Sequence, residues 1–392
     1  MAQAFTSPEF LTQHTQSILS FYEDVAKDPQ GGFFQNFLDD GYVFDTTSRH
    51  LVSSARFVFN YAEAYRRGYG SHYQQWALHA LRYLETHHYR SETGHYAWML
   101  GDTSDNTAMA YGQAFVVLAY AHAHMAGLTD ATEKLNHLYD LLECHFYQPN
   151  YQAYADECDA TLSELAPYRG QNANMHMCEA FIAAYQATGD ERFLTRAQQL
   201  ARRFAGELCD ASDGLVWEHY TQDWQPDWQY NIDKPDDLFK PWGFQPGHQV
   251  EWTKLLLQLD QLSPDNWYRE RAKSLFDQAM MKGWDSQFGG LVYGFAPSGE
   301  FADDQKYFWV QAEAIAAAYR LYDLTQNTEY LDWYKRLWQY SWDHLIDHQH
   351  GAWYRVVSRK GAKISNEKSP MGKVDYHTLG ACWDVLDVMT KP

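Results

Sequence analysis

A short phrase rich in glycine and aromatic residues recurs six times along the chain, and this repeat limits the fold more than any other feature. The copies read GGFFQNFLDDG from Gly31, GHYAWMLGD from Gly94, YQAYADECDA from Tyr151, DGLVWEHYTQDW from Asp213, GGLVYGFAPSG from Gly289 and GAWYRVVSRKG from Gly351. The intervals are 62, 58, 62, 76 and 61 residues between the markers Gly32, Gly94, Gln152, Gly214, Gly290 and Gly351. This period indicates six supersecondary units that bury their apolar faces against one another.

The segments between the phrases have helical periodicity. In residues 180–204, AFIAAYQATGDERFLTRAQQLARRF, apolar residues recur at three- and four-residue spacing on both sides of a Gly-Asp break. Each unit is therefore predicted to be two helices and a short hairpin. Six such units predict an all-α fold, a six-hairpin (α/α)6 barrel formed as a single domain over residues 1–392, with short β-hairpins at one end.

The fourth interval is about 15 residues longer than its neighbours. The extra residues fall in QPDWQYNIDKPDDLFKP, a stretch rich in Trp and Asp, and we expect residues 225–240 to form a loop over the barrel mouth.

Composition narrows the class of partner. The formal net charge of −20 leaves no basic stripe that would neutralise phosphates, which argues against nucleic acid and anionic membranes. Aromatic residues make up 17% of the chain, an excess that favours a concave site for a small neutral molecule such as a sugar. The sequence fits a monomer and a homodimer equally.

Targeting signals and cysteine usage predict a cytoplasmic protein. The first residues contain no basic stretch followed by an apolar run, and no segment is apolar enough to cross a bilayer. The five cysteines are scattered and lack CxxC spacing, so we expect reduced thiols.

Unusual residues occupy equivalent positions in the six units, near the start of each predicted inner helix. They are Arg56, Gln113, His176, His248, Trp309 and His377. Side chains from the same end of six inner helices converge on one pocket, so this ring is the candidate site.

Acidic residues follow two of the histidines at helical spacing. Glu251 lies three residues after His248, and Glu179 lies three residues after His176. Because residues three apart share a helix face, we expect Glu251 to orient His248 and raise its basicity. A polar patch at the edge of the core remains an alternative, and so does a metal site, although HExxH and paired ExxH motifs are lacking.

Other members of the ring have structural alternatives. In YRGQNANMH, Asn172 or Asn174 fits a helix cap as well as a substrate contact. Trp309, beside Phe308, fits either the core or a sugar-stacking platform. Arg56 lies on an otherwise apolar stripe, where a charge is costly unless paired, and this favours a functional role.

Six motifs together resemble one known family. They are RHLVSSARFVF, YGQAFVVLAYA, YRGQNANMHMCEAF, GFQPGHQVEWTKLLLQL, YFWVQAEAIAAAY and DYHTLGACWDV. In this order, over nearly the whole chain, they are similar to the N-acylglucosamine 2-epimerase superfamily, whose fold is the same six-hairpin barrel. The YRGxNANMH and PGHxxEW phrases look closest to its bacterial, metal-independent aldose–ketose isomerases that act on mannose and related sugars.

The resemblance implies a role for each matching residue. His248 and His377 are implied to be the general acid/base pair at C1 and C2, with Arg56 stabilising the oxyanion. His176 and Glu251 are implied to orient the open-chain sugar and assist ring opening. The pocket-lining positions implied for substrate binding are Asn172, Trp309, Glu313, Tyr111 and Gln113, together with His176. No metal and no cofactor are expected.

Histidine and arginine meet the chemical demands of this reaction without a metal. Proton removal at C2 of an open-chain aldose needs a base near neutral pKa and positive charge near the developing oxyanion. Return of the proton to C1 of a cis-enediol gives a ketose, whereas delivery to the opposite face of C2 gives the epimer. We favour mannose–fructose isomerisation, with lyxose–xylulose as a further pair, and keep 2-epimerisation as the alternative.

Two further classes remain open from sequence. The same barrel hosts glycoside hydrolases that use two carboxylates, and the candidate acids are Asp156, Glu157, Glu218 and Asp375. A protein that only binds sugar is the other alternative, but it gives no reason to place three histidines around one mouth.

Overall fold

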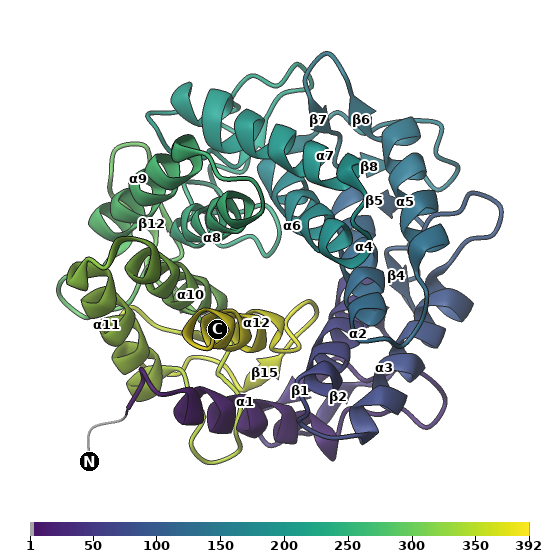
Figure 1. The fold of residues 1–392 in the computed structure, drawn as a ribbon, viewed down its shortest axis with the longest axis horizontal. Coiled ribbons are helices and arrows are strands. Elements are labelled where there is room, and N and C mark those ends of the chain that lie inside the picture. The colour runs from purple at the N-terminus through teal and green to yellow at the C-terminus, as the bar shows by residue number, and fades with distance from the viewer. Residues whose placement is uncertain (1–3, 392) are drawn as a thin grey trace.

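The computed structural model describes residues 4–391, and its helices form two concentric rings (Figure 1). The inner ring consists of α2 (Leu51–Arg66), α4 (Ala110–Met125), α6 (Gln171–Thr188), α8 (Pro246–Leu262), α10 (Phe308–Thr325) and α12 (Tyr376–Met389). The outer ring consists of α1 (Pro8–Glu23), α3 (His72–Tyr83), α5 (Thr132–His145), α7 (Glu191–Ala201), α9 (Asn266–Gly283) and α11 (Thr328–His344). The π-helical turns η1 (Leu84–His88) and η2 (Arg202–Leu208) continue α3 and α7. The predicted (α/α)6 barrel is confirmed.

Burial distinguishes the two rings. In α2 every residue from Leu51 to Ala64 is buried, because one face packs on the outer ring and the other closes the barrel. Outer helices are amphipathic: α7 buries Phe193, Leu194 and Ala197 together with two residues one turn on, which forms a single apolar stripe. A side-chain cap, such as that of Asp190 on the amide of Arg192, starts this outer helix.

Short strands gather at the end of the barrel where the inner helices begin. They are β1 (Asn36–Leu38), β2 (Val43–Asp45), β3 (Arg49–His50), β4 (Met99–Leu100), β5 (Ala108–Met109), β6 (Tyr147–Gln148), β7 (Ala153–Tyr154), β8 (Glu157–Cys158), β9 (Arg169–Gly170), β10 (His219–Tyr220), β11 (Gly294–Phe295), β12 (Phe301–Asp303), β13 (Lys306–Tyr307), β14 (Val356–Val357) and β15 (Glu367–Ser369). Each of the six repeated phrases contains at least one of them.

These strands join each unit to the next one around the ring. The segment ahead of an inner helix pairs antiparallel with the following phrase: β3 with β4, β5 with β8, β9 with β10, and β13 with β14. Ahead of α8 a single bridge, Phe244 to Phe295, takes the same place. The ring closes where β15 pairs with β1 and where α1 packs on α12, so the two ends of the chain complete the barrel (Figure 1).

Buried amides fasten four phrases to the inner helices. Gln113 bonds the main-chain N and O of Tyr96 at 3.0 and 2.8 Å, and Asn174 bonds those of Tyr154 at 2.8 and 2.9 Å. Gln249 and Gln311 make the same paired bonds to the phrases next to them. Asn174 is therefore a clamp, and the hypothesis that it caps a helix is wrong, because the cap position of α6 is Gly170 and makes no side-chain cap bond.

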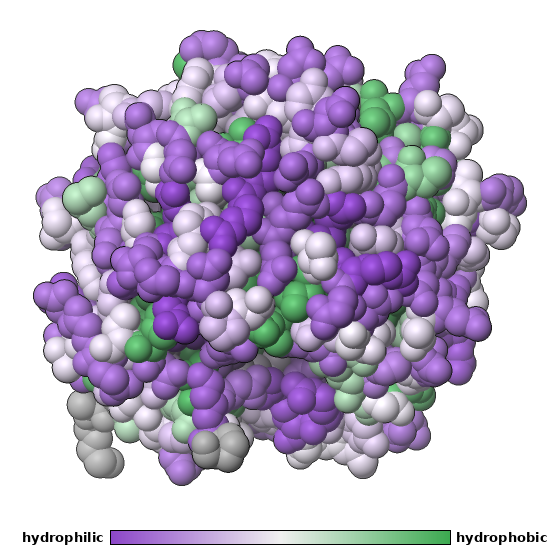
Figure 2. Space-filling view, turned by 45° about the horizontal axis from the view of Figure 1, so that its top comes forward, coloured by the Kyte–Doolittle hydropathy of each residue, from purple (hydrophilic) through white to green (hydrophobic). Residues whose placement is uncertain are grey.

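The outer surface is polar on the face that Figure 2 shows. The face shown in Figure 2 is mostly hydrophilic, with hydrophobic residues in small separate patches. Among the described residues, no helix combines the length and the hydrophobicity that a bilayer crossing needs.

Candidate active site

One cavity of about 780 Å³ opens at the strand end of the barrel. Eight residues singled out from the sequence line it: Arg56, Tyr111, Asn172, His176, His248, Glu251, Trp309 and His377. They come from α2, α4, α6, α8, α10 and α12, so all six inner helices contribute to the site. These eight positions converge on one cavity, as their spacing in the sequence predicts.

All three histidines of the cavity bond a carboxylate through Nδ1. His377 Nδ1 lies 2.7 Å from Glu313 Oε1, and His176 Nδ1 lies 2.9 Å from Glu179 Oε2. His248 Nδ1 lies 2.9 Å from both oxygens of Glu218. A neutral imidazole that donates from Nδ1 keeps its lone pair on Nε2, which leaves Nε2 as the nitrogen available to a ligand.

The expectation that Glu251 orients His248 is wrong. Glu218, at the edge of β10, takes that place because its main-chain oxygen accepts the first amide of α6, from Gln171, at 3.1 Å. The side-chain amide of Gln171 donates to the same carboxylate at 3.0 Å, and the Trp252 indole holds Gln171 at 2.9 Å. The strand phrase of one unit therefore orients the histidine of the next inner helix.

Arg56 is buried and faces His377. Its Nη2 donates to His377 Nε2 and to the Tyr111 hydroxyl, each at 3.2 Å, and Nη1 donates to the carbonyl of Gly372. An arginine can donate to Nε2 only when that nitrogen has its lone pair, so the contact favours neutral His377. Burial first, and then the positive charges of Arg56 and Lys254, hold the pKa of His377 well below its usual value.

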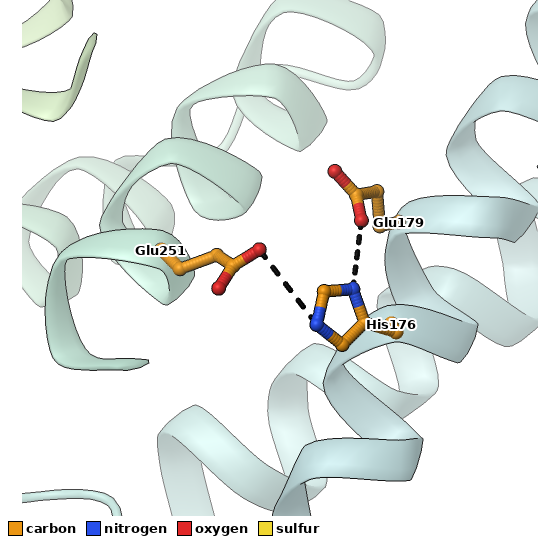
Figure 3. A group of neighbouring side chains, drawn as sticks. All are labelled: His176, Glu179 and Glu251. Atoms are coloured by element: carbon orange, nitrogen blue, oxygen red, sulfur yellow. Dashed lines mark hydrogen bonds and ion pairs between the residues drawn. The ribbon is translucent and has the colours of Figure 1, made fainter. Parts of the chain in front are cut away.

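Glu251 is a buried acid without a hydrogen-bond partner. The residue is 1% exposed, neither carboxyl oxygen meets a donor within residues 4–391, and Oε1 lies 3.9 Å from His176 Nε2 (Figure 3). Burial and then the nearby charge of Glu313 raise the pKa of Glu251 well above its usual value. A protonated carboxyl aimed into a cavity is able to donate a hydrogen bond to a ligand oxygen.

Two groups of side chains have spacing that would allow a metal ion: His176, Glu179 and Glu251, and Glu251, Glu313 and His377. Their surroundings fit a metal poorly. In the first group Glu179 and Glu251 face opposite nitrogens of the His176 ring (Figure 3). In the second group Glu313 already pairs with the ammonium of Lys254 at 2.7 Å. A second cation beside that lysine would meet charge repulsion.

Two residues expected to bind substrate lie elsewhere. Gln113 is a buried clamp on Tyr96, since its amide is fully used by main-chain groups, and it does not line the cavity. Glu313 lies behind His377 and contacts Lys254, so its place is that of an orienting acid. Both predictions are wrong for the same reason: the polar group of each side chain is already bonded within the protein. Gln113 bonds the main chain of Tyr96, and Glu313 bonds His377 and Lys254.

Trp309 and Asn172 keep the positions expected for ligand contacts. The Trp309 ring lies close to two histidines, with centroid distances of 5.1 Å to His248 and 5.7 Å to His377. Asn172 lines the cavity, and its Oδ1 is buried without a donor among the described residues. The helix-cap alternative for Asn172 is excluded, since no side chain caps α6.

The long fourth phrase closes part of the mouth. Leu238 and Phe239 line the cavity, and the Phe239 ring lies 5.8 Å from that of His50 and 5.9 Å from that of Trp98. A segment of the fourth unit thus reaches residues of the first and second units, as the loop prediction for residues 225–240 required.

The acids proposed for a hydrolase do not flank the cavity. Glu251 is the only Asp or Glu among the described lining residues. Asp375 is buried under α12, where the Tyr22 hydroxyl and Lys373 each bond it at 2.5 Å, and Asp156 accepts the amide of Gly170 at 2.7 Å. The described part of the chain therefore places no pair of carboxylates across the cavity.

The chain is similar to known sugar isomerases and epimerases in both sequence and structure. The family model described as N-acylglucosamine 2-epimerase matches residues 32–381. A D-mannose isomerase of Marinomonas mediterranea is 50% identical over 390 residues, which is 99% of each chain. A crystal structure of D-mannose isomerase gives a TM-score of 0.97 at 49% identity, over 99% of this chain and 100% of that one. The cellobiose 2-epimerase of Spirochaeta thermophila, at 23% identity, has the same fold, with a TM-score of 0.84 over 97% and 98% of the two chains.

Proposed function

The chain belongs to the N-acylglucosamine 2-epimerase family, and from this premise we propose that it interconverts D-mannose and D-fructose. The full-length similarity to D-mannose isomerases supports this substrate pair. The observation that carries the proposal is the convergence of three Nδ1-bonded histidines and one buried arginine on a single cavity. Proton transfer at a carbon next to a carbonyl needs a base and a positive charge near the developing oxyanion, and histidine and arginine supply them.

His377 is the base of the proposed reaction. Its neutral form presents the Nε2 lone pair, and Glu313 stabilises the positive charge that the imidazole gains when it takes the C2 proton. Arg56, which donates toward His377 Nε2, stabilises negative charge on the oxygen of the enediolate. Delivery of a proton from the imidazolium, after exchange with solvent, to C1 gives the ketose.

The other groups bind the sugar and move protons on oxygen. His248, which is held by Glu218 and also lies close to Trp309, exchanges protons with the sugar oxygens. His176 and the protonated Glu251 act in ring opening and in holding the open chain. No step in this scheme needs a metal, because Arg56 supplies the positive charge near the developing oxyanion.

The 2-epimerase remains the second candidate because of one observation. Two histidines, His248 and His377, line the same cavity, and the ring of each lies close to that of Trp309. If the second histidine protonates C2 from the opposite face, the product of mannose is glucose.

Product analysis separates these alternatives. The enzyme is treated with EDTA and incubated with [1-13C]mannose, and 13C NMR follows the products. Fructose as the first product supports the proposal, glucose as the first product supports the epimerase, and unchanged mannose contradicts both. Activity that EDTA removes and Mn²⁺ or Zn²⁺ restores would contradict the metal-free scheme.

A further inference from the structure

A buried lysine lies directly beneath the histidines of the cavity. Lys254, on α8, has a side chain 9% exposed, and its ammonium lies 2.7 Å from Glu313 Oε2 and 3.7 Å from Glu179 Oε1. A lysine at this depth is retained only when it is paired, because burial of an isolated charge is costly. Burial opposes the charged form, but Glu313 and Glu179 together raise the pKa of Lys254 above its usual value.

Each carboxylate that binds Lys254 uses its other oxygen for a histidine of the cavity. Glu313 Oε1 accepts from His377 at 2.7 Å, and Glu179 Oε2 accepts from His176 at 2.9 Å. The two imidazole centroids are 6.4 Å apart. One ammonium therefore closes a chain of contacts that starts at one histidine and ends at the other.

The charges of Glu313, Glu179, Lys254 and Arg56 cancel when both histidines are neutral. Glu313 and Glu179 supply two negative charges, and Lys254 and Arg56 supply two positive charges, while the raised pKa of Glu251 favours its neutral form. Without the lysine, each carboxylate would favour a proton on its histidine, because opposite charges at hydrogen-bond distance stabilise each other.

We propose that Lys254 is a positioning residue: by sharing the charges of Glu313 and Glu179, it keeps His377 and His176 neutral, with the proton on Nδ1 and the lone pair on Nε2. This role rests on the proposed function, since a base at His377 must be unprotonated before the sugar binds. Lys254 does not line the sugar cavity and acts only through the two acids.

Four acidic residues face Lys254, and Glu313 and Glu179 are the two that share its charge. Glu179 faces it from α6, Glu251 from its own helix and Glu313 from α10. Asp384 faces it from α12, but Arg320 takes up that carboxylate at 2.5 Å. Behind Lys254 lies a second cavity of about 880 Å³, lined in part by pairs that Glu63 forms with Arg66, Arg67 and His122.

The test compares Lys254→Met with Lys254→Arg. Lys254 is one of the groups that lower the pKa of His377, so its removal raises that pKa. The acid limb of kcat/KM should then move to higher pH in Lys254→Met. A shift of one pH unit means about a tenfold loss on that limb and little loss above it. Lys254→Arg keeps the charge and should keep the wild-type limb.

Histidine NMR gives a readout without any sugar. Enzyme labelled with 15N-histidine is titrated, with His377→Gln and His176→Gln used for assignment. Both resonances should titrate at higher pH in Lys254→Met than in the wild type. Gln258→Met is the matched control, since Gln258 lies on α8 one turn further on, lines the same rear cavity and bonds Asp384 instead. Its titrations should equal those of the wild type.

Unchanged histidine titrations in Lys254→Met, with activity lost equally at every pH, would overturn the proposal. If this variant does not fold, Glu179→Gln/Lys254→Met removes one charge of each sign, and His377 must still titrate higher than in Glu179→Gln. Because the titration uses the free enzyme, it gives a result even if mannose is not the substrate.

Discussion

His248 and His377 face the same cavity but are supported in different ways. Each Nδ1 bonds a buried glutamate, Glu218 at 2.9 Å and Glu313 at 2.7 Å. Behind Glu218 lies a neutral amide, that of Gln171, whereas behind Glu313 lies the ammonium of Lys254. We call each histidine, its glutamate and the group behind that glutamate an arm, and the groups behind the glutamates the second layer. The two arms have the same contact at Nδ1 and differ in the second layer.

This difference explains how two imidazoles in one cavity can favour different protonation states and so have different roles. A cation behind the carboxylate and another at Nε2 keep His377 in its unprotonated form, which a base requires. Within residues 4–391 no lysine or arginine pairs with the carboxylate of Glu218, and this carboxylate stabilises the His248 imidazolium that forms when protons move on the sugar oxygens. We therefore assign the carbon proton to the His377 arm and the oxygen protons to the His248 arm.

Removal of either imidazole should have the largest effect. We expect His377→Asn and His248→Asn each to lower kcat by about 10³ to 10⁴, the upper range for general acid–base catalysis. The arms should differ in exchange: His377→Asn loses solvent exchange of the mannose C2 proton, while His248→Asn retains it better than it retains turnover. NMR of mannose in D2O measures both.

Thermal unfolding serves as the control for these two variants, which should melt within a few degrees of the wild type. Wild-type activity in either variant removes that histidine from the mechanism. Equal loss of exchange and turnover in both variants would mean that the two arms do not differ.

Removal of the orienting acids should have the second-largest effect on kcat. It should also lower the free energy of unfolding by different amounts in the two arms. We expect Glu313→Gln and Glu218→Gln each to lower kcat about 100-fold, because an amide is able to hold the imidazole in the wrong tautomer. Glu313→Gln also leaves Lys254 with only its longer contact to Glu179, and this break in a buried pair costs about 3 to 5 kcal/mol. Glu218→Gln breaks no ion pair with a lysine or arginine and should cost about 1 to 3 kcal/mol.

Denaturant unfolding at one pH compares the two stability costs. Equal destabilisation by both changes would show that the Lys254 pair does not distinguish the arms.

Glu251 lies between the arms, and its substitution should have a smaller effect. Its raised pKa means that the folded protein binds a proton that the unfolded chain releases near its ordinary pKa. The stability from this group is therefore complete at low pH and is lost as pH rises toward the folded-state pKa. Glu251→Gln should lack this dependence and should lower kcat/KM about tenfold, because an amide cannot donate the proton used in ring opening.

Melting temperatures of the wild type and Glu251→Gln between pH 4 and pH 9 test this expectation. Parallel curves for the two proteins would mean that Glu251 is ionised in the folded state.

Trp309 touches both arms and should have the smallest effect. We expect Trp309→Phe to raise KM about tenfold at most, the scale of one aromatic contact, with kcat nearly unchanged. Steady-state kinetics with mannose and with fructose measure this. A large fall in kcat would mean that Trp309 holds the two histidines in place.

The barrel could be predicted because its signal is repeated. Six phrases at nearly equal spacing determined the number of units, and the apolar period of residues 180–204 determined the helical pairs. The pairing of each strand with the next unit could not be predicted, because strands of two or three residues have no pattern of their own. The clamp role of Gln113 and Asn174 depends on that pairing and was missed with it.

The cavity residues could be predicted where one position repeats around the ring. The second layer could not, because it depends on contacts between units. His176 and Glu179 share a helix and bond as their spacing predicts, whereas His248 passes over Glu251, at the same spacing, to Glu218 of another unit. Lys254 had a usable signal, a charge directly before the apolar run Leu255, Leu256 and Leu257.

The central claim is that His377 moves a carbon proton through an enediol, and deuterium incorporation tests it most directly. Wild-type enzyme is incubated with mannose in D2O until equilibrium, and 1H NMR follows the C2 proton of mannose and the C1 protons of fructose. We predict fructose as the first product, with solvent deuterium entering one C1 position and then C2 of mannose, and neither event in His377→Asn. Conversion that reaches equilibrium without any deuterium in either sugar, or glucose as the first product, would contradict the account.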